Sequence, residues 1–123
     1  MPFTDQLHLC VQIDVNFNEI DQAASIQLIA AMKGKSMASI GMAECQLGVE
    51  GAKAMAVLVS VMGSLTSLFL EHTNIGATGA KAIAEMLSVT GSLTKLDLLY
   101  NQLDESAKAA LRAAARPALK LDL

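Results

Sequence analysis

Two glutamates and two histidines are the residues whose types best suit acid–base or metal chemistry. His72 directly follows Glu71, whereas Glu44 and His8 lie well before them in the chain. An imidazole beside a carboxylate can transfer protons near neutral pH or bind a metal ion. Charged residues beside a strand are far more often solvated, so we predict neither a metal site nor a catalytic role for this group.

No sequence motif for catalysis or cofactor binding accompanies these residues. The chain has no glycine-rich phosphate loop, no paired metal-ligand motif and no nucleophile elbow. We therefore assign no catalytic residues and no cofactor, and we expect a protein that is not an enzyme.

The composition argues against nucleic acid and membranes as partners. The 123 residues, 53% of them hydrophobic, predict one domain over residues 1–123. Nine basic residues are scattered along a chain of net charge -3, so no basic stripe can neutralise a phosphate backbone. The longest strongly apolar stretch, residues 54–62, is about half the roughly 20 residues that a membrane span needs. We expect it to be a buried helix.

The start of the chain and its cysteines predict a cytoplasmic protein. The opening MPFTDQLHL has an early acidic residue, no basic start and no continuous apolar core, so a signal peptide is not indicated. Cys10 and Cys45 are the two cysteines and lie far apart in sequence. Free thiols in a reducing compartment are expected rather than a disulfide.

The elements that would position these side chains come from an internal repeat. Segments 37–64, 65–92 and 93–117 are in phase with one another, and 10–36 keeps its apolar positions in the same phase. A last segment, 118–123, begins a fifth copy. Self-similarity with a period of about 28 residues over most of a chain predicts a solenoid of stacked units.

Each copy opens with the pattern L-x-x-L-x-L-x-x-N-x-L, which is clearest at Leu93, Leu96, Leu98, Asn101 and Leu103. Its central residues alternate with period two, as in a short strand, and the second half of the copy, as in 79–87, has helical spacing. The pattern resembles leucine-rich repeats, and copies with GAKA at the helix start are similar to the ribonuclease-inhibitor-like subclass. That subclass also occurs in Ran GTPase-activating proteins, tropomodulins and NOD-like receptors. The resemblance implies an α/β solenoid with a parallel sheet on the concave face and helices on the convex face.

The resemblance also assigns a structural role to one position per copy. Side chains at this position lie inside the turn after each strand and hydrogen-bond to backbone groups of adjacent units, and they are Asn18, Cys45, Thr73 and Asn101. A separate pattern, alternation over residues 7–17, predicts that the first strand is longer than the repeat requires.

The residues between the strand leucines predict a binding face, because successive side chains alternate across a strand. One row on the concave face reads Asp14, Gly41, Phe69, Asp97 and Asp122, and a second reads Asn16, Ala43, Glu71 and Leu99. Beyond the strand ends lie Phe17, Glu44, His72 and Tyr100. We predict a partner-binding site formed by Phe69, Glu71, His72, Asp97, Leu99 and Tyr100. Aromatic anchors with an acidic surround would suit a basic peptide or protein. The alternative is that Phe69 and Leu99 cover each other and bind nothing.

The outer faces of the helices differ along the chain. The matching outward positions are expected at Ile29, Val57, Glu85 and Arg112, with Met32 and Met62 adding to an apolar patch on the first two units. Either neighbouring side chains cover this patch or it is a contact surface.

The final strand predicts a site of self-association. An edge strand with no unit stacked over it presents unpaired backbone groups, and the residues concerned are Leu119, Lys120, Leu121, Asp122 and Leu123. In a homodimer these strands would run antiparallel about a two-fold axis, with Lys120 of one chain near Asp122 of the other. Alternatively, these two charges blunt the edge and the chain is a monomer.

Taken from the sequence, the leading hypothesis is a non-enzymatic protein-interaction scaffold that binds a protein partner on its concave face. One alternative is a GTPase-activating or other regulatory leucine-rich-repeat protein, which would need a polar residue aimed at a nucleotide. The other is a minimal solenoid whose partner is a second copy of itself.

Overall fold

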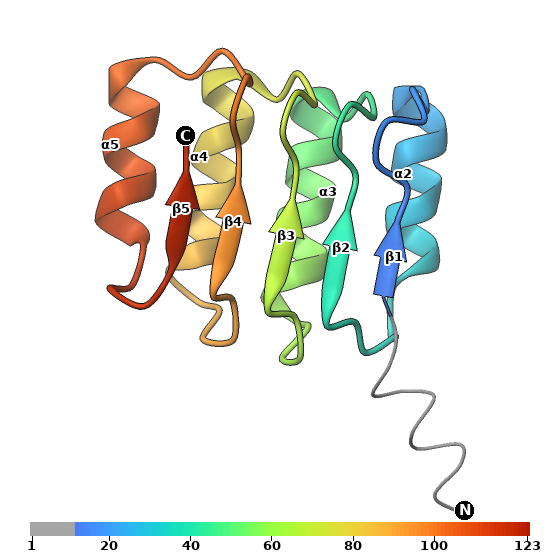
Figure 1. The fold of residues 1–123 in the computed structure, drawn as a ribbon, viewed down its shortest axis with the longest axis horizontal. Helices are drawn as coiled ribbons and strands as arrows, with labels where there is room; N and C mark the ends of the chain where they lie inside the picture. The colour runs from blue at the N-terminus through green and yellow to red at the C-terminus, as the bar shows by residue number, and fades with distance from the viewer. Residues whose placement is uncertain (1–11) are drawn as a thin grey trace, which may run out of the picture.

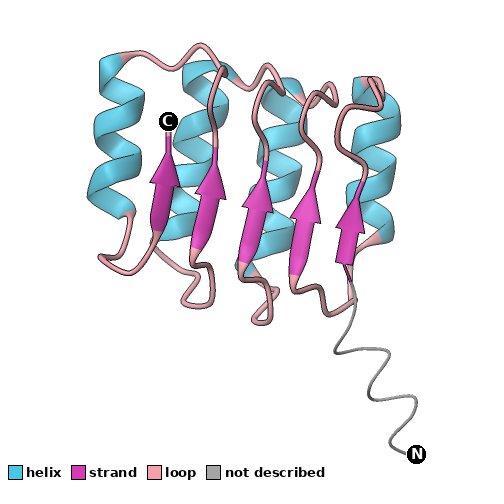
Figure 2. Ribbon diagram, in the orientation of Figure 1, coloured by secondary structure: helices cyan, strands magenta, loops and turns pink. Residues whose placement is uncertain are grey.

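The fold is a single parallel sheet covered on one side by helices (Figure 1, Figure 2). A computed structural model describes residues 12–123, and the structural statements below refer to this part of the chain. The strands follow one another across the sheet in the order β1-β2-β3-β4-β5. The elements in chain order are β1 (Gln12–Asp14), α2 (Gln22–Ala31), β2 (Ser39–Gly41), α3 (Gly48–Ser60), β3 (Ser67–Phe69), α4 (Gly76–Leu87), β4 (Lys95–Asp97), α5 (Glu105–Ala114) and β5 (Lys120–Asp122). The predicted α/β solenoid is confirmed, and the strand and helix sides are called the concave and convex faces below.

The strand–helix units stack in register. The central residues of the strands pair along the sheet in one continuous row, formed by Ile13, Ile40, Leu68, Leu96 and Leu121. The three inner members of this row have no exposed surface. Each unit therefore buries its strand residues against the units on both sides, as a solenoid requires.

The helices begin in two different ways. Asp21 caps α2 by accepting a hydrogen bond of 2.8 Å from the backbone N–H of Ala24, and Asp104 caps α5 in the same manner. The middle helices α3 and α4 have no side-chain cap and instead start at Gly48 and Gly76, whose φ angles are +63° and +64°. Glycine adopts this left-handed conformation without steric cost, so the chain can turn sharply from strand end to helix.

The core between the two layers is aliphatic and rich in methionine. Its largest fully buried side chains are Met32, Met37, Ile40, Met42, Leu47, Met55, Leu65, Leu68, Leu70, Ile75, Ile83 and Leu93. The apolar stretch 54–62 lies largely in α3, as predicted, although Val57 and Val61 point to solvent. Among the described residues, no helix combines the length and the apolar character needed to cross a membrane.

Gly79 sets the distance between α3 and α4. A Cβ atom at this position would lie 2.9 Å from the Cβ of Ile75 and 3.0 Å from the Cβ of Ala52. The first contact lies within the start of α4, and the second joins the two helices, so glycine permits the close approach of α4 to Ala52 of α3.

The turn after β4 confirms the structural role predicted for Asn101. The Asn101 side chain is 1% exposed and reaches back into the preceding unit. Its Oδ1 accepts from the backbone N–H groups of Thr73 and Ile75, and its Nδ2 donates to the carbonyls of Leu70 and Leu98. The amide thus satisfies buried backbone groups of two adjacent units at once.

The equivalent positions in the other units follow this rule less fully. Cys45 Sγ donates to the carbonyl of Val15 in the preceding unit at 3.5 Å, and burial raises the pKa of this thiol. Thr73 Oγ1 donates to Leu70 of its own unit. Asn18 is exposed, and its Nδ2 donates only within its own turn, to Val15 at 3.0 Å. The prediction of a bond between units is therefore wrong for Asn18 in the described structure.

Two further expectations require correction on the convex face. Ile29 is 3% exposed, Met32 1% and Met62 5%, so these three side chains belong to the core. Because Ile13 pairs with Ile40, the residue that corresponds to Val57 is Ala30, which is exposed. An offset of one residue turns a helical side chain by about 100°, enough to exchange an outward position for an inward one. Val57, Glu85 and Arg112 are exposed as predicted.

At its C-terminal end, the first strand stops before the alternation predicted. Of the expected segment 7–17, residues 7–11 lie outside the described residues, as do His8 and Cys10. Within the rest, β1 spans Gln12–Asp14 and the chain turns before Phe17, which has a φ of +64°. Backbone pairing continues past the strand ends, since Val15 N–H donates to Gly41 and Phe17 N–H donates to Ala43. The alternating pattern thus extends into a turn that remains hydrogen-bonded to the next unit.

Candidate binding face on the parallel sheet

The register of the strands confirms the first predicted row of the concave face. Asp14, Gly41, Phe69, Asp97 and Asp122 occupy equivalent positions on consecutive strands. Phe69 is half-buried and its pairing partner Asp97 is 8% exposed. The row therefore places one aromatic ring directly beside a nearly buried carboxylate.

A lysine that the sequence reasoning missed lies at the centre of this surface. Lys95 belongs to a row one pleat earlier, in register with Ser67 and Lys120. Its Nζ lies 5.8 Å from the centroid of the Phe69 ring and 3.5 Å from Oδ2 of Asp122. The period-two alternation that selected Asp97 also selects Lys95, two residues earlier, and this signal was available in the sequence. The face is thus acidic but already holds one cation against its aromatic ring.

Glu71 has a buried oxygen without a hydrogen-bond partner. Its Oε1 is shielded from solvent and receives no hydrogen bond from any described residue. Burial raises the pKa of the Glu71 carboxyl, and the negative charge of Asp97 raises it further, whereas Lys95 acts in the opposite direction. Buried acceptors are normally paired, so the unpaired Oε1, together with the neighbouring Asp97 side chain, disfavours the ionised form of this carboxyl.

The rim above the strands carries a row of side chains on strained backbone. Phe17, Glu44, His72 and Tyr100 each precede the turn position of their unit, and their φ angles are +64°, +63°, +55° and +61°. For residues with a Cβ this left-handed conformation costs roughly 1–2 kcal/mol each. Phe17 is 63% exposed and Tyr100 75% exposed. The rings of His72 and Tyr100 meet edge to face, with centroids 6.4 Å apart.

No aromatic ring within residues 12–123 lies in the core. Phe69 lies on the concave face, and Phe17 and Tyr100 lie on its rim, while every core side chain is aliphatic or sulfur-containing. Large rings would ordinarily contribute most to a core because of the area that they bury. In this chain all the described rings are placed where a partner could reach them.

A small hollow lies next to Phe69 on the side of β1 and β2. It has a volume of about 260 Å³ and is lined by Gln12, Ile13, Asp14, Asn16, Ser39, Gly41 and Phe69. Asn16 lies against Gly41, where a Cβ atom would be 2.8 Å from its Nδ2, and the Oδ1 of Asn16 accepts from Ala43 N–H at 2.6 Å. Asp14 gives this hollow a negative wall.

The predicted site residues fall into two groups. Phe69, Glu71, Asp97 and Leu99 lie on β3 and β4 or directly after these strands, and Leu99 N–H donates to Asp97 Oδ1 at 3.1 Å. His72 and Tyr100 lie together on the rim. Within residues 12–123 no group of three or more histidine, cysteine, aspartate or glutamate side chains is arranged to hold a metal ion.

The residues predicted for self-association have an intrachain partner. Leu119, Leu121 and Leu123 are half-buried against the core, and Lys120 is exposed. Asp122 forms an ion pair with Lys95 of the same chain, whereas the predicted dimer would pair it with Lys120 of a second copy. Association through residues 119–123 remains a prediction.

Comparison with known proteins agrees with the fold. A family described as "Leucine Rich repeat" matches residues 64–84, which contain β3 and the first part of α4. Among solved structures, one similar chain is "Leiomodin-1 Actin-Binding Site 2 (ABS2)", with a TM-score of 0.82 and 19% sequence identity over 90% of this chain and 68% of that chain. No curated protein sequence matches this chain. Together these findings support a leucine-rich-repeat protein.

Proposed function

We propose that this chain is a non-enzymatic scaffold that binds a basic segment of a partner protein on its concave face. The observation that carries the proposal is the placement of Phe17, Phe69 and Tyr100, all on this face or its rim and none in the core. Aromatic side chains surrounded by charge are the usual anchors of protein interfaces. A leucine-rich-repeat fold supports a role in protein binding at this coarser level.

Lys95 indicates how a basic side chain would be recognised. Its ammonium group lies between the Phe69 ring and the Asp122 carboxylate, where it gains both a cation–π contact and an ion pair. The hollow beside Gly41 offers the opposite side of Phe69, with Asp14 as the negative group. A lysine or arginine of the partner would enter this hollow and contact Phe69 from the side that Lys95 leaves free.

Glu71 and Tyr100 would bind the remainder of the segment. The carboxylate of Glu71, which is half-buried on this face, would add negative charge beside the bound segment. Tyr100 and His72 form a rigid pair of rings at the end of the strands, against which an apolar side chain can pack. Opposite charge would also increase the association rate and make it sensitive to salt.

The proposal also includes the repeat subclass, the cellular compartment and the non-enzymatic role. GAKA at the helix start supports the ribonuclease-inhibitor-like subclass, and the free, buried thiol of Cys45 supports a reducing compartment such as the cytoplasm. The absence of a catalytic motif in the sequence supports a binding role rather than an enzymatic one.

The test is capture of a partner with matched baits. The full chain, the variant Phe69→Ala/Tyr100→Ala and the control Arg112→Ser, which alters an exposed residue on the convex side of α5, are each used to recover proteins from a lysate. We expect one basic protein to be recovered with the full chain and the control and to be lost with the double variant, while all three baits keep the same circular dichroism spectrum. Equal recovery by the folded double variant would contradict the proposal. Filamentous actin is tested in parallel, because the solved fragment of similar fold is named for actin binding.

A further inference from the structure

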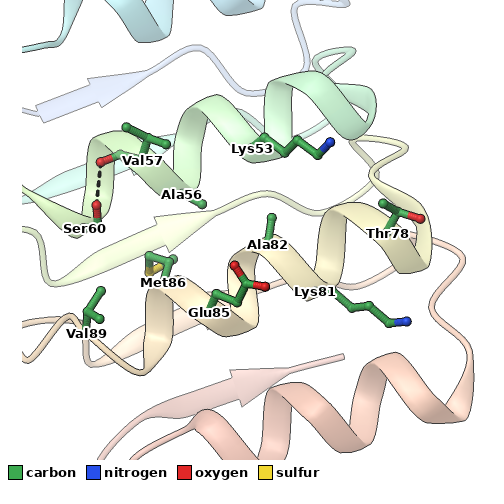
Figure 3. A pocket seen from close by; sticks show the side chains of 10 residues that line it. All are labelled: Lys53, Ala56, Val57, Ser60, Thr78, Lys81, Ala82, Glu85, Met86 and Val89. Atoms are coloured by element: carbon green, nitrogen blue, oxygen red, sulfur yellow. Dashed lines mark hydrogen bonds between the residues drawn. The ribbon is translucent and has the colours of Figure 1, made fainter.

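The convex face has a groove between α3 and α4 that the concave-face proposal does not use. The groove has a volume of about 500 Å³ (Figure 3). Its floor is formed by Ala56 and Met86, which are buried, and by Ala82, which is half-buried. At one end stand Val57 and Val89, which are 69% and 68% exposed. This end of the groove is open to water and mainly apolar, and the hydroxyl of Ser60 at the same end donates to the carbonyl of Val57.

Exposed valines of this kind continue across α3. Val61, which is 77% exposed, lines a second groove of about 300 Å³ between α2 and α3, together with Val57, Ile26 and Ala30. The two grooves therefore flank a single apolar ridge on the outer side of α3. Clustered apolar side chains on the surface of a soluble domain commonly mark a contact site.

The other end of the groove between α3 and α4 is positively charged. Lys53 and Lys81 both extend from that end (Figure 3). Lys81 forms no ion pair with any residue in 12–123, and Lys53 has only an exposed neighbour, Glu50, at 3.8 Å. The N-termini of the two parallel helices lie at the same end and add partial positive charge.

We propose that this groove binds an amphipathic helix of a partner protein, with acidic residues at the end that meets Lys53 and Lys81. From Thr78 to Leu87 the groove follows about two and a half turns of α4, roughly 14 Å, and Val89 lies just past the end of this helix; that length matches apolar residues at i, i+3 or i+4, and i+7 of the bound helix. The small side chains on the floor let a third helix approach the two that form the groove.

Glu85 fixes the orientation of the bound helix. This carboxylate lines the groove and has no cationic partner among the described residues. Glu85 lies in the middle of the groove, between Lys81 and Val89, so an acidic residue bound toward the valines meets only this negative charge, whereas at the other end it meets two lysines. The charge pattern thus selects a helix that is acidic at one end only.

The probe is a synthetic, fluorescently labelled helix of about four turns, with leucines at the spacing above and glutamates confined to one end. Its matched control peptide has lysines in place of those glutamates. Binding is measured by anisotropy on the full chain, and the contact surface is mapped by the amide shifts of the labelled protein. We expect micromolar binding of the acidic peptide, at least tenfold tighter than that of the basic peptide, with shifts at Val57, Ala82 and Val89 and none at Phe69 or Tyr100.

Three surface variants complete the test. Val57→Ser should weaken the acidic peptide at least fivefold, and Lys53→Glu/Lys81→Glu should reverse the preference between the two peptides. Arg112→Glu, on the convex side of α5 but outside the groove, should leave both affinities unchanged. No binding, shifts confined to the concave face, or an unchanged preference in the folded charge-reversal variant would overturn the proposal.

Discussion

The buried amide of Asn101 should stabilise the fold far more than the equivalent amide of Asn18. Replacing Asn101 by leucine keeps the number and branching of the side-chain heavy atoms but removes partners from three buried backbone groups that have no other: the N–H of Thr73, the N–H of Ile75 and the carbonyl of Leu98. Each unsatisfied group costs about 1–3 kcal/mol, so three such groups predict a loss of at least about 3 kcal/mol in the free energy of unfolding. This is a large part of the 5–15 kcal/mol typical of a domain.

The matched control is the same substitution at the equivalent position of the first unit. Asn18 is exposed and makes only local bonds to Val15 and Asn16, whose carbonyls water can reach after Asn18→Leu. We expect a change below about 1 kcal/mol. Urea titrations followed by circular dichroism measure both. Equal losses, or a loss below about 1 kcal/mol for Asn101→Leu, would refute the assignment of Asn101 as the bridge between units.

Four further predictions follow from the concave face and the last strand. Lys95→Met removes the cation that lies against the Phe69 ring, so calorimetry should show tighter binding of the captured basic partner, and weaker binding would contradict this. The free energy of unfolding should change by less than about 1 kcal/mol, because the ion pair of Lys95 with Asp122 is partly exposed. Tyr100→Gly relieves the strain of a left-handed φ and should stabilise the chain by up to about 1 kcal/mol, while it weakens binding of the partner. A destabilised variant would show that the tyrosine ring supports the fold. The pKa of Glu71 is raised in the folded chain, so ionisation of this carboxyl opposes folding at pH values above the raised pKa. The penalty disappears when the pH falls below the usual pKa of a glutamate, so Glu71→Gln should raise the melting temperature at pH 7 and not at pH 3.5. A rise of equal size at both pH values would exclude this cause. If the chain self-associates through β5, Leu121→Pro should convert dimer to monomer by removing a donor from that strand, and a wild-type chain that sediments as a monomer at high micromolar concentration would end this hypothesis.

The repeat made most of the fold predictable from sequence. The spacing of Leu93, Leu96 and Leu98 identifies a strand, and its repetition fixes a parallel order, because each unit can bury its leucines only against a neighbour of the same kind. The turn role of Asn101 also followed from its position in the pattern, and the structure confirms it.

The errors arose where a single residue of register or a tertiary contact decides the outcome. Ile29 was predicted to point outward from a 28-residue step. The step between the first two units is 27 residues, so the outward position in α2 is the next residue, Ala30. Lys95 was missed because the predicted site used only the rows of Phe69 and Glu71, and Lys95 lies in the row that precedes Phe69 and Asp97. The unpaired Oε1 of Glu71 depends on how Asp97 and its neighbours pack, and no sequence pattern reports that.

The most direct test of the central proposal is an amide-shift titration of the isotopically labelled full chain with a short synthetic peptide rich in arginine. We expect saturable shifts centred on Phe69, Glu71 and Leu99. Salt should weaken these shifts, and the folded variant Phe69→Ala/Tyr100→Ala should show none of them. Shifts spread evenly over the surface, or shifts confined to α3 and α4, would contradict a basic partner on the concave face.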